Sequence, residues 1–367
     1  MMSQGRLLGS FCLSVALSIG PSADAADRPP LPLAVLPALS SPGGAELENE
    51  AARLSARWAP VFLQRTSREH PERDRPLPVD FDGNWDATDN WRHTTPAFSR
   101  TRPVVYGSAI LTATHAFLTY TLFYPRDWES LCLPYLCHDN DLEVLLLVVE
   151  RGGATNGPGR LVLVETKAHK SYVALRGAEV ARAAGERPLV KVESGGHGMY
   201  ALRARDRVVG ADRWFVPERA TTPFTPPGAA ALERYALLSL RETLWPRRSP
   251  ASERGRLWKQ GESDAFAYSG TRAGRRGRSL AAWMNGSEYT GGVRPPWALK
   301  ADEARGDWFL DPALSTLGNY RSWFPAGRPV ATAYAYNPYL DDLGRECAGK
   351  ACPKPSVPRR GTRAGIF

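Results

Sequence analysis

Between Val104 and about Arg205 the chain alternates short apolar segments of β type with turns rich in glycine, and this alternation limits the fold more than any other feature. The segments are Val104–Leu111, Ala116–Tyr124, Leu142–Glu150, Leu161–Lys167, Ser171–Leu175, Leu189–Glu193 and Met199–Ala204. Closely spaced strands with such turns are typical of antiparallel all-β architectures. We therefore predict a mainly β (α+β) fold: an antiparallel β-sandwich with peripheral helices and a loop-rich C-terminal extension.

The segments on either side of these strands complete the predicted organisation. Residues 45–58 place Leu47, Ala51, Leu54 and Trp58 on one side of an amphipathic helix. A second helix is predicted at Ala229–Leu244. The remainder is rich in Gly, Pro and Trp, so we predict a domain over residues 45–245 and a loop-rich extension over residues 246–367 that packs on it.

The N-terminal residues have the pattern of an export signal. A basic start, a short apolar run from Leu7 to Gly20 and small residues up to Ala25 predict a signal peptide over residues 1–25. A Pro-rich mobile leader follows at residues 26–44. No later stretch is long and apolar enough to span a bilayer. We therefore expect a secreted or periplasmic protein without a transmembrane segment in the mature chain.

The cysteines agree with export. Five are present, and the four outside the predicted signal peptide form two pairs of equal spacing. An even number of cysteines in an exported chain predicts disulfides. Three connectivities are open, of which we favour the local pairs Cys132–Cys137 and Cys347–Cys352; free buried thiols are the alternative.

The charge adds little about partners. The chain carries 47 Lys and Arg against 38 Asp and Glu, a net charge of +9, and the excess is spread along the sequence. Apart from this charge no nucleic-acid-binding pattern is present, so no nucleic-acid partner is predicted.

Polar residues gather where two of the predicted strands meet. Asp127 follows the first strand, and His138, Asp141 and Glu143 lead into the second. Because Asp141 and Glu143 are two residues apart in a strand, they point to the same face. Carboxylates packed together repel one another unless a cation neutralises them. Oxygen ligands with one imidazole favour Mg²⁺ or Ca²⁺, with Mn²⁺ as an alternative, over Zn²⁺.

Two further histidines lie in predicted turns. His169 separates two strands, and His197 belongs to a Gly-rich turn. They are the candidate catalytic residues if the chain is a hydrolase, although the absence of a nucleophile elbow, a phosphate loop and a His-Glu-x-x-His motif makes an enzyme the less favoured reading.

The order of these pieces resembles the necrosis- and ethylene-inducing-peptide-like (NLP) family over residues 45–205. The matching pieces are Val105-Tyr106-Gly107, Tyr120–Asp127, Cys137–Glu143, Ala168–Tyr172 and Pro188-Leu189-Val190 with His197. Family members carry a Gly-His-Arg-His-Asp-Trp-Glu heptad where this chain has Cys-His-Asp-Asn-Asp-Leu-Glu. The resemblance implies a secreted β-sandwich that binds Mg²⁺ or Ca²⁺ through Asp127, His138, Asp141 and Glu143.

The resemblance also implies a function. NLP proteins act on plasma membranes by recognising sphingolipid glycan headgroups, so a glycan or membrane lipid headgroup is the expected partner and membrane damage the expected effect. The departures from the heptad include Cys137, Asn140 and Leu142, while the four ligand types are kept. Two alternatives stay open: a metal-dependent hydrolase of a phosphoester or glycan, and an exported protein with a purely structural cation site.

Overall fold

The computed structural model describes residues 42–68, 70–83, 85, 90–93, 100–127, 139–152, 157, 159–169, 171–208, 212–227, 230–247, 296 and 308–346. The predicted signal peptide, His138 and all the cysteines lie outside the described residues. The predictions that concern them therefore stay predictions.

The described helices are short except at the start. They are α1 (Pro42–Trp58), α2 (Asn90–His93), α3 (Leu240–Thr243), α5 (Pro312–Tyr320) and α6 (Pro338–Glu346), with the 3₁₀ turns η1 (Pro71–Arg73), η4 (Gly177–Glu179), η5 (Trp245–Arg247) and η8 (Arg321–Trp323). Helix α1 confirms the amphipathic helix predicted at residues 45–58. Its apolar side chains Ala51, Leu54 and Trp58 are buried, at 3%, 4% and 2% exposure.

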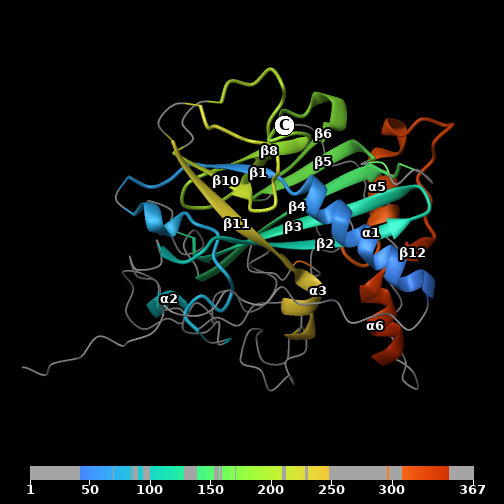
Figure 1. Cartoon of the computed structure of the whole chain (residues 1–367), viewed down its shortest axis with the longest axis horizontal. Coiled ribbons are helices and arrows are strands. Elements are labelled where there is room, and N and C mark those ends of the chain that lie inside the picture. Colours follow the sequence, from blue (N-terminus) through green and yellow to red (C-terminus); the bar gives the residue numbers. More distant parts are fainter. Residues whose placement is uncertain are drawn as a thin grey trace, which may run out of the picture. The chain divides into compact units, whose positions relative to one another are not determined.

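The strands form a single sheet. They are β1 (Val61–Gln64), β2 (Val104–Thr112), β3 (His115–Arg126), β4 (Asp139–Glu150), β5 (Arg160–Ala168), β6 (Ser171–Arg176), β7 (Arg182–Ala183), β8 (Arg187–Val192), β9 (Met199–Ala201), β10 (Arg213–Pro217), β11 (Ala231–Ser239) and β12 (Tyr334–Tyr336). Each apolar segment predicted between Val104 and Ala204 overlaps one of them (Figure 1).

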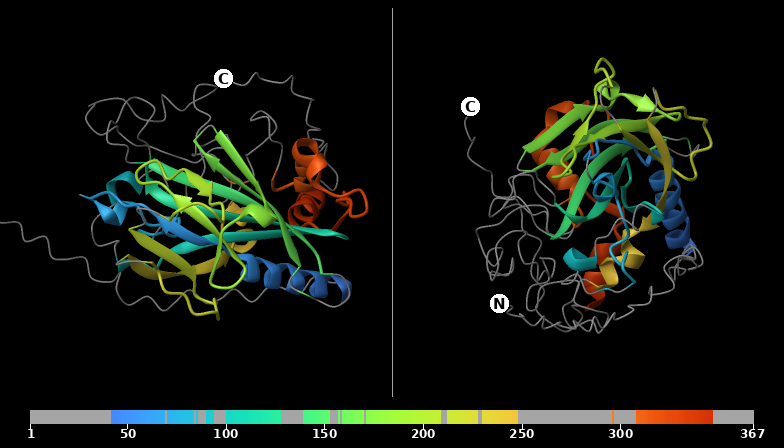
Figure 2. Two further views of the ribbon diagram at one scale, coloured as in Figure 1. Left: turned by 90° about the horizontal axis from the view of Figure 1, so that it is seen from above. Right: turned by 90° about the vertical axis from the view of Figure 1, so that its left-hand side faces the viewer.

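The predicted antiparallel sandwich is wrong, although the mainly β class is right. The strands follow the order β6-β5-β4-β3-β2-β11-β10-β1-β8-β7, with β12 on β2 and β9 on β8. Three of the pairings are parallel: β1 with β8, β10 with β11, and β11 with β2. The result is one mixed sheet that curls until it is nearly closed like a barrel (Figure 2).

The second predicted helix, Ala229–Leu244, is also wrong over most of its length. Residues 231–239 form β11, and only Leu240–Thr243 are helical, as α3. Strand β11 joins β10 to β2 by parallel pairing on both sides. The hydrogen bonds of two neighbouring strands thus outweigh the helix preference of a Leu-, Ala- and Glu-rich segment.

Both faces of the central strands are buried. Along β4, Leu145, Leu147 and Val149 face an interior core shared by α1 and strands from both halves of the sheet. The alternate residues Leu142, Val144, Leu146 and Val148 face an outer core completed by Trp308, Phe309 and Ala313. A strand covered on both sides reads as a continuous apolar run. In the part of the chain that the structure describes, no helix is long and apolar enough to cross a membrane.

Candidate functional site

Acidic residues close one end of the interior core, at the junction of β3 and β4. Asp141 lies opposite Tyr124 of β3, and Glu143 lies opposite Leu122. Both carboxylates therefore share the inward face, as their two-residue spacing predicts. Their exposure is 2% for Asp141 and 5% for Glu143. Asp127, 7% exposed, comes directly after the last residue of β3, which pairs with the first residue of β4.

The backbone at the start of β4 is conformationally restricted. Asn140 has a φ of 60°, in the left-handed region, and its side chain is fully buried. Asn90 of α2 donates from Nδ2 to Oδ1 of Asn140 over 2.6 Å. Asn tolerates left-handed φ values better than most residues, because its short side chain bonds locally. The pair thus fixes the backbone immediately before Asp141.

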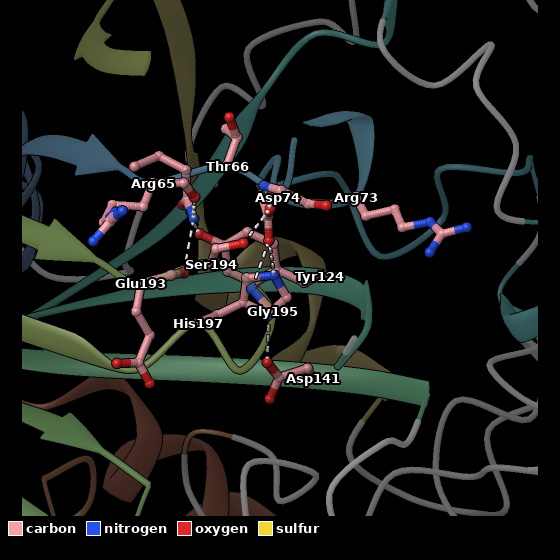
Figure 3. A network of polar contacts seen from close by, with 12 residues as sticks. Arg65, Thr66, Arg73, Asp74, Tyr124, Asp141, Glu193, Ser194, Gly195 and His197 are labelled. Atoms are coloured by element: carbon pink, nitrogen blue, oxygen red, sulfur yellow. Dashed lines mark hydrogen bonds and ion pairs between the residues drawn. The ribbon is translucent and has the colours of Figure 1, made fainter. Parts of the chain in front are cut away.

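A buried imidazole ties Asp141 to a distant segment. His197 Nδ1 lies 2.7 Å from Asp141 Oδ2, and His197 Nε2 lies 3.1 Å from Asp74 Oδ1. The three side chains are 0%, 2% and 1% exposed, respectively. Figure 3 shows the His197 ring held between the two carboxylates. With both nitrogens occupied, the ring carries a proton on each of them and joins the loop after β8 to β4.

Asp74 is the anchor of this network. Its Oδ1 accepts from Gly195 N at 2.8 Å, and its Oδ2 accepts from Ser194 Oγ at 2.9 Å and from Ser67 N at 2.5 Å. These donors, together with His197, satisfy a carboxylate that has been removed from water. Asp74 thereby fixes the Gly-rich loop that carries His197.

Tyr124 packs against one face of the His197 ring. Its ring stacks on the His197 ring with centroids 3.7 Å apart and parallel planes. Its hydroxyl donates to Gln64 Oε1 over 2.8 Å, and Gln64 Nε2 donates to the backbone oxygens of Arg65 and Glu193. The site is therefore held by β1, β3, β4 and the loop that follows β8.

The charges of the network shift its pKa values in opposite directions. Burial by itself lowers the pKa of His197, but the bonds to Asp141 and Asp74 outweigh it and raise that pKa to about 10. Burial raises the pKa of Asp74, yet His197 and the backbone donors bring it below its usual value. Burial and the neighbouring charge of Asp141 hold the pKa of Glu143 well above its usual range.

His169 differs from His197 in exposure. It sits in the turn between β5 and β6 with a φ of 54°, and its side chain is 49% exposed. Its Nε2 bonds to Glu193 Oε1, while Tyr200 donates to the other oxygen of Glu193 at 3.2 Å. The bond to Glu193 raises the pKa of His169, against partial burial. Of the two predicted catalytic candidates, only His169 presents its ring to solvent.

The structure thus brings part of the predicted cation site together. Asp141 and Glu143 are neighbours, and the charges of Asp127 and Asp141 both act on Glu143. Within the described residues, no three His, Cys, Asp or Glu side chains are close enough to hold a metal ion. The four-residue cation site, which includes His138, stays a prediction.

Sequence reasoning missed Asp74, Tyr124 and Gln64. Asp74 lies in an irregular stretch of Pro, Asp and Arg residues and bonds to a histidine 123 positions away. Tyr124 is the last residue of a predicted strand, whereas Gln64 lies in a stretch for which no element was predicted. No local pattern marks these three positions, because their roles depend on contacts between distant segments.

Comparisons with known proteins were made with the chain and its structure. No protein-family model and no curated protein matches the chain. It is similar to the solved structure of NLPPya in complex with glucosamine, at 14% identity, covering 57% of this chain and 86% of that one, with a TM-score of 0.32. It is also similar to Necrosis and Ethylene inducing Protein 2 from the causal agent of cocoa's Witches Broom disease, at 16% identity, 61% and 84% coverage and a TM-score of 0.30.

A further similar structure is the non-toxic HaNLP3 protein, at 14% identity, 51% and 74% coverage and a TM-score of 0.28. The names place these structures in the family that the sequence resembles. At these identities and TM-scores, membership of the family stays a prediction.

Proposed function

We propose that this protein binds a divalent cation at the acidic end of β3 and β4 and, through that cation, a glycan or lipid headgroup. One observation carries the proposal. The Glu143 carboxylate is nearly fully buried beside Asp141, and no hydrogen bond or ion pair joins it to another described residue. The charges of Lys167 and His197 offset only part of the effect of burial and of Asp141 on Glu143. Leaving a buried carboxylate without a hydrogen bond is unfavourable, and a cation removes that cost.

The donor set suits a hard cation. Asp141, Glu143 and Asp127 would supply carboxylate oxygens, with His138 as the one nitrogen ligand. Such a set fits Mg²⁺ or Ca²⁺. His197 occupies Oδ2 of Asp141, so it orients that carboxylate in the way that hydrogen-bonded neighbours orient metal ligands. A bound cation with a site open to solvent would coordinate hydroxyl or phosphate oxygens of a headgroup.

The metal part is tested by calorimetry of chelator-treated protein with CaCl₂ and MgCl₂. We expect Glu143→Gln to weaken binding by at least about tenfold, because the amide keeps the shape but removes the charge. The double variant Glu186→Gln, Asp206→Asn serves as control: it removes exposed carboxylates elsewhere and should bind like wild type. Equal affinity in wild type and Glu143→Gln would refute the site.

The headgroup part needs separate measurements. NLPPya is described in complexes with glucosamine and with mannosamine, so these two sugars are the first probes, each with and without chelator. Leakage of dye from vesicles that contain glycosylated sphingolipid tests for membrane damage. Sugar binding that is unchanged by chelator would refute a cation-dependent site.

A metal-dependent hydrolase is the second candidate, and the exposed His169–Glu193 pair is the observation that favours it. An imidazole near a metal site can act as a general base. The test is release of product from a panel of phosphoesters and glycans. Product release that is abolished in His169→Gln and occurs without vesicle leakage would support the hydrolase and contradict the binding function.

A further inference from the structure

A pocket of about 490 Å³ lies at the opposite end of β4 from the acidic site. It opens beside Glu150, the last residue of the strand. From Asp141 to Glu150 the strand advances roughly 30 Å at about 3.3 Å per residue. Arginine and glycine residues form most of the wall. The pocket is therefore a separate place from the proposed cation site.

Two guanidinium groups are held side by side in this pocket by one carboxylate. Arg160 of β5 donates from Nε and Nη2 to Oε2 of Glu150, at 2.9 and 2.5 Å. Arg328, in the segment before β12, donates from Nη1 to Oε1 of Glu150 at 3.0 Å. Their side chains are 58% and 65% exposed. A guanidinium has five N–H donors, so each group keeps donors that no described residue accepts.

A third guanidinium is fixed rather than free. Arg151 donates from Nε and Nη2 to the carboxylate of Glu50, at 2.8 and 2.5 Å, and from Nη1 to the backbone oxygen of Thr112 at 2.5 Å. This paired arginine gives the pocket a rigid wall that ties the end of β4 to α1 and to the end of β2.

Glycines make up the other described part of the pocket wall. Gly159 has a φ of +72°, and a Cβ there would lie 2.4 Å from the backbone oxygen of Glu150. A Cβ on Gly152 would lie 3.0 Å from the backbone oxygen of Gly157. At these two glycines backbone packs against backbone, and glycine has no side chain to fill the pocket.

We propose that this pocket binds an oxyanion, a phosphate or sulfate group, carried as an ester on a sugar-sized molecule. Guanidinium groups recognise tetrahedral oxyanions through paired N–H donors. The pocket is open to solvent, and its volume of about 490 Å³ exceeds what one oxyanion fills. Glu150 arranges the two guanidinium groups, and it stays ionised at neutral pH: burial raises its pKa, but Arg160 and Arg328 lower it further.

The test is calorimetry on the full-length protein in the presence of chelator, with glucose 6-phosphate, inorganic phosphate, inorganic sulfate and glucose. We expect the ester to bind more tightly than either inorganic anion, and glucose not to bind. The double variant Arg160→Gln, Arg328→Gln should lose at least about tenfold in affinity for the ester, since two charge-assisted contacts are removed.

The matched control is Arg102→Gln, Arg234→Gln, which removes the same charge from two arginines that contact Glu218 elsewhere. If the control variant loses as much affinity for the ester, binding depends on the net charge of the protein and not on this pocket. Inorganic phosphate binding as tightly as the ester would overturn the sugar-sized ligand, and no binding of any anion to wild type would overturn the site. Hydrogen-exchange protection of residues 157–160 by the ester in wild type gives a second readout that needs no variant.

Discussion

The buried His197 network makes a sharp prediction about alkaline stability. The imidazolium has a pKa of about 10 in the folded protein, against 6.5 for an ordinary histidine. One pKa unit corresponds to about 1.4 kcal/mol, so the network favours the charged ring by about 5 kcal/mol. Because the folded-state pKa is the higher one, this stabilisation is complete below pH 6.5 and is mostly lost by pH 10.

The measurement is urea unfolding followed by tryptophan fluorescence, from pH 5.5 to pH 10. We expect the free energy of unfolding of wild type to fall by several kcal/mol between pH 6.5 and 10 relative to His197→Gln. At pH 6 the variant should be about 3 to 5 kcal/mol less stable than wild type, the usual cost of breaking a buried pair. The two curves should converge near pH 10.

An exposed pair supplies the control for this experiment. His93 contacts Asp82 with its side chain 43% exposed, and an exposed pair contributes little to stability, so His93→Gln should change the free energy of unfolding by less than about 1 kcal/mol. Parallel profiles for wild type and His197→Gln between pH 6.5 and 10 would refute the charged imidazolium.

Three further predictions concern single positions. Burial keeps the folded-state pKa of His115 low, at about 4, so the free energy of unfolding of wild type should fall by about 2 kcal/mol as the pH falls from 6.5 to 4. In His115→Gln this fall, measured by urea unfolding at the two pH values, should be smaller. Glu143→Gln should raise the melting temperature in chelator, because folding no longer has to place a carboxyl group whose pKa is raised by burial and by Asp141; an unchanged or lower value contradicts the repulsion. Gly177→Ala should destabilise the protein by several kcal/mol, since the new Cβ would lie 1.9 Å from a backbone oxygen. Gly318 lies in α5, and a Cβ there would have nothing within 4 Å, so Gly318→Ala should stabilise the protein by about 0.5 to 1 kcal/mol in the same assay.

The sequence predicts the strands well and their arrangement poorly. The runs that became β3 and β4 are long and apolar because each strand is covered on both faces, and the two strands, which are consecutive in the chain, pair with each other. The parallel contacts of β11 and of β1 with β8 join segments far apart in the chain. Alternation along one strand shows which residues are buried but carries no information about the partner strand.

The same reasoning explains what could be predicted of the site. The positions of Asp141 and Glu143 on one face follow from the period of a strand, which is a local property. The exposed or buried state of His169 and His197 does not follow from sequence, because both lie in Gly- or Lys-flanked turns. Only the fold shows that the one at 197 is enclosed by Asp74 and Tyr124.

The Asp74–His197–Asp141 network also bears on how the protein folds. Its two bonds join residues 123 and 56 positions apart, so both close long stretches of chain. Contacts of such separation form slowly, because the entropy of closing the intervening chain must be lost first. If the network is absent from the folding transition state, its loss accelerates unfolding and leaves the folding rate unchanged. The residues that shape the acidic end of the barrel would then also set the lifetime of the native state.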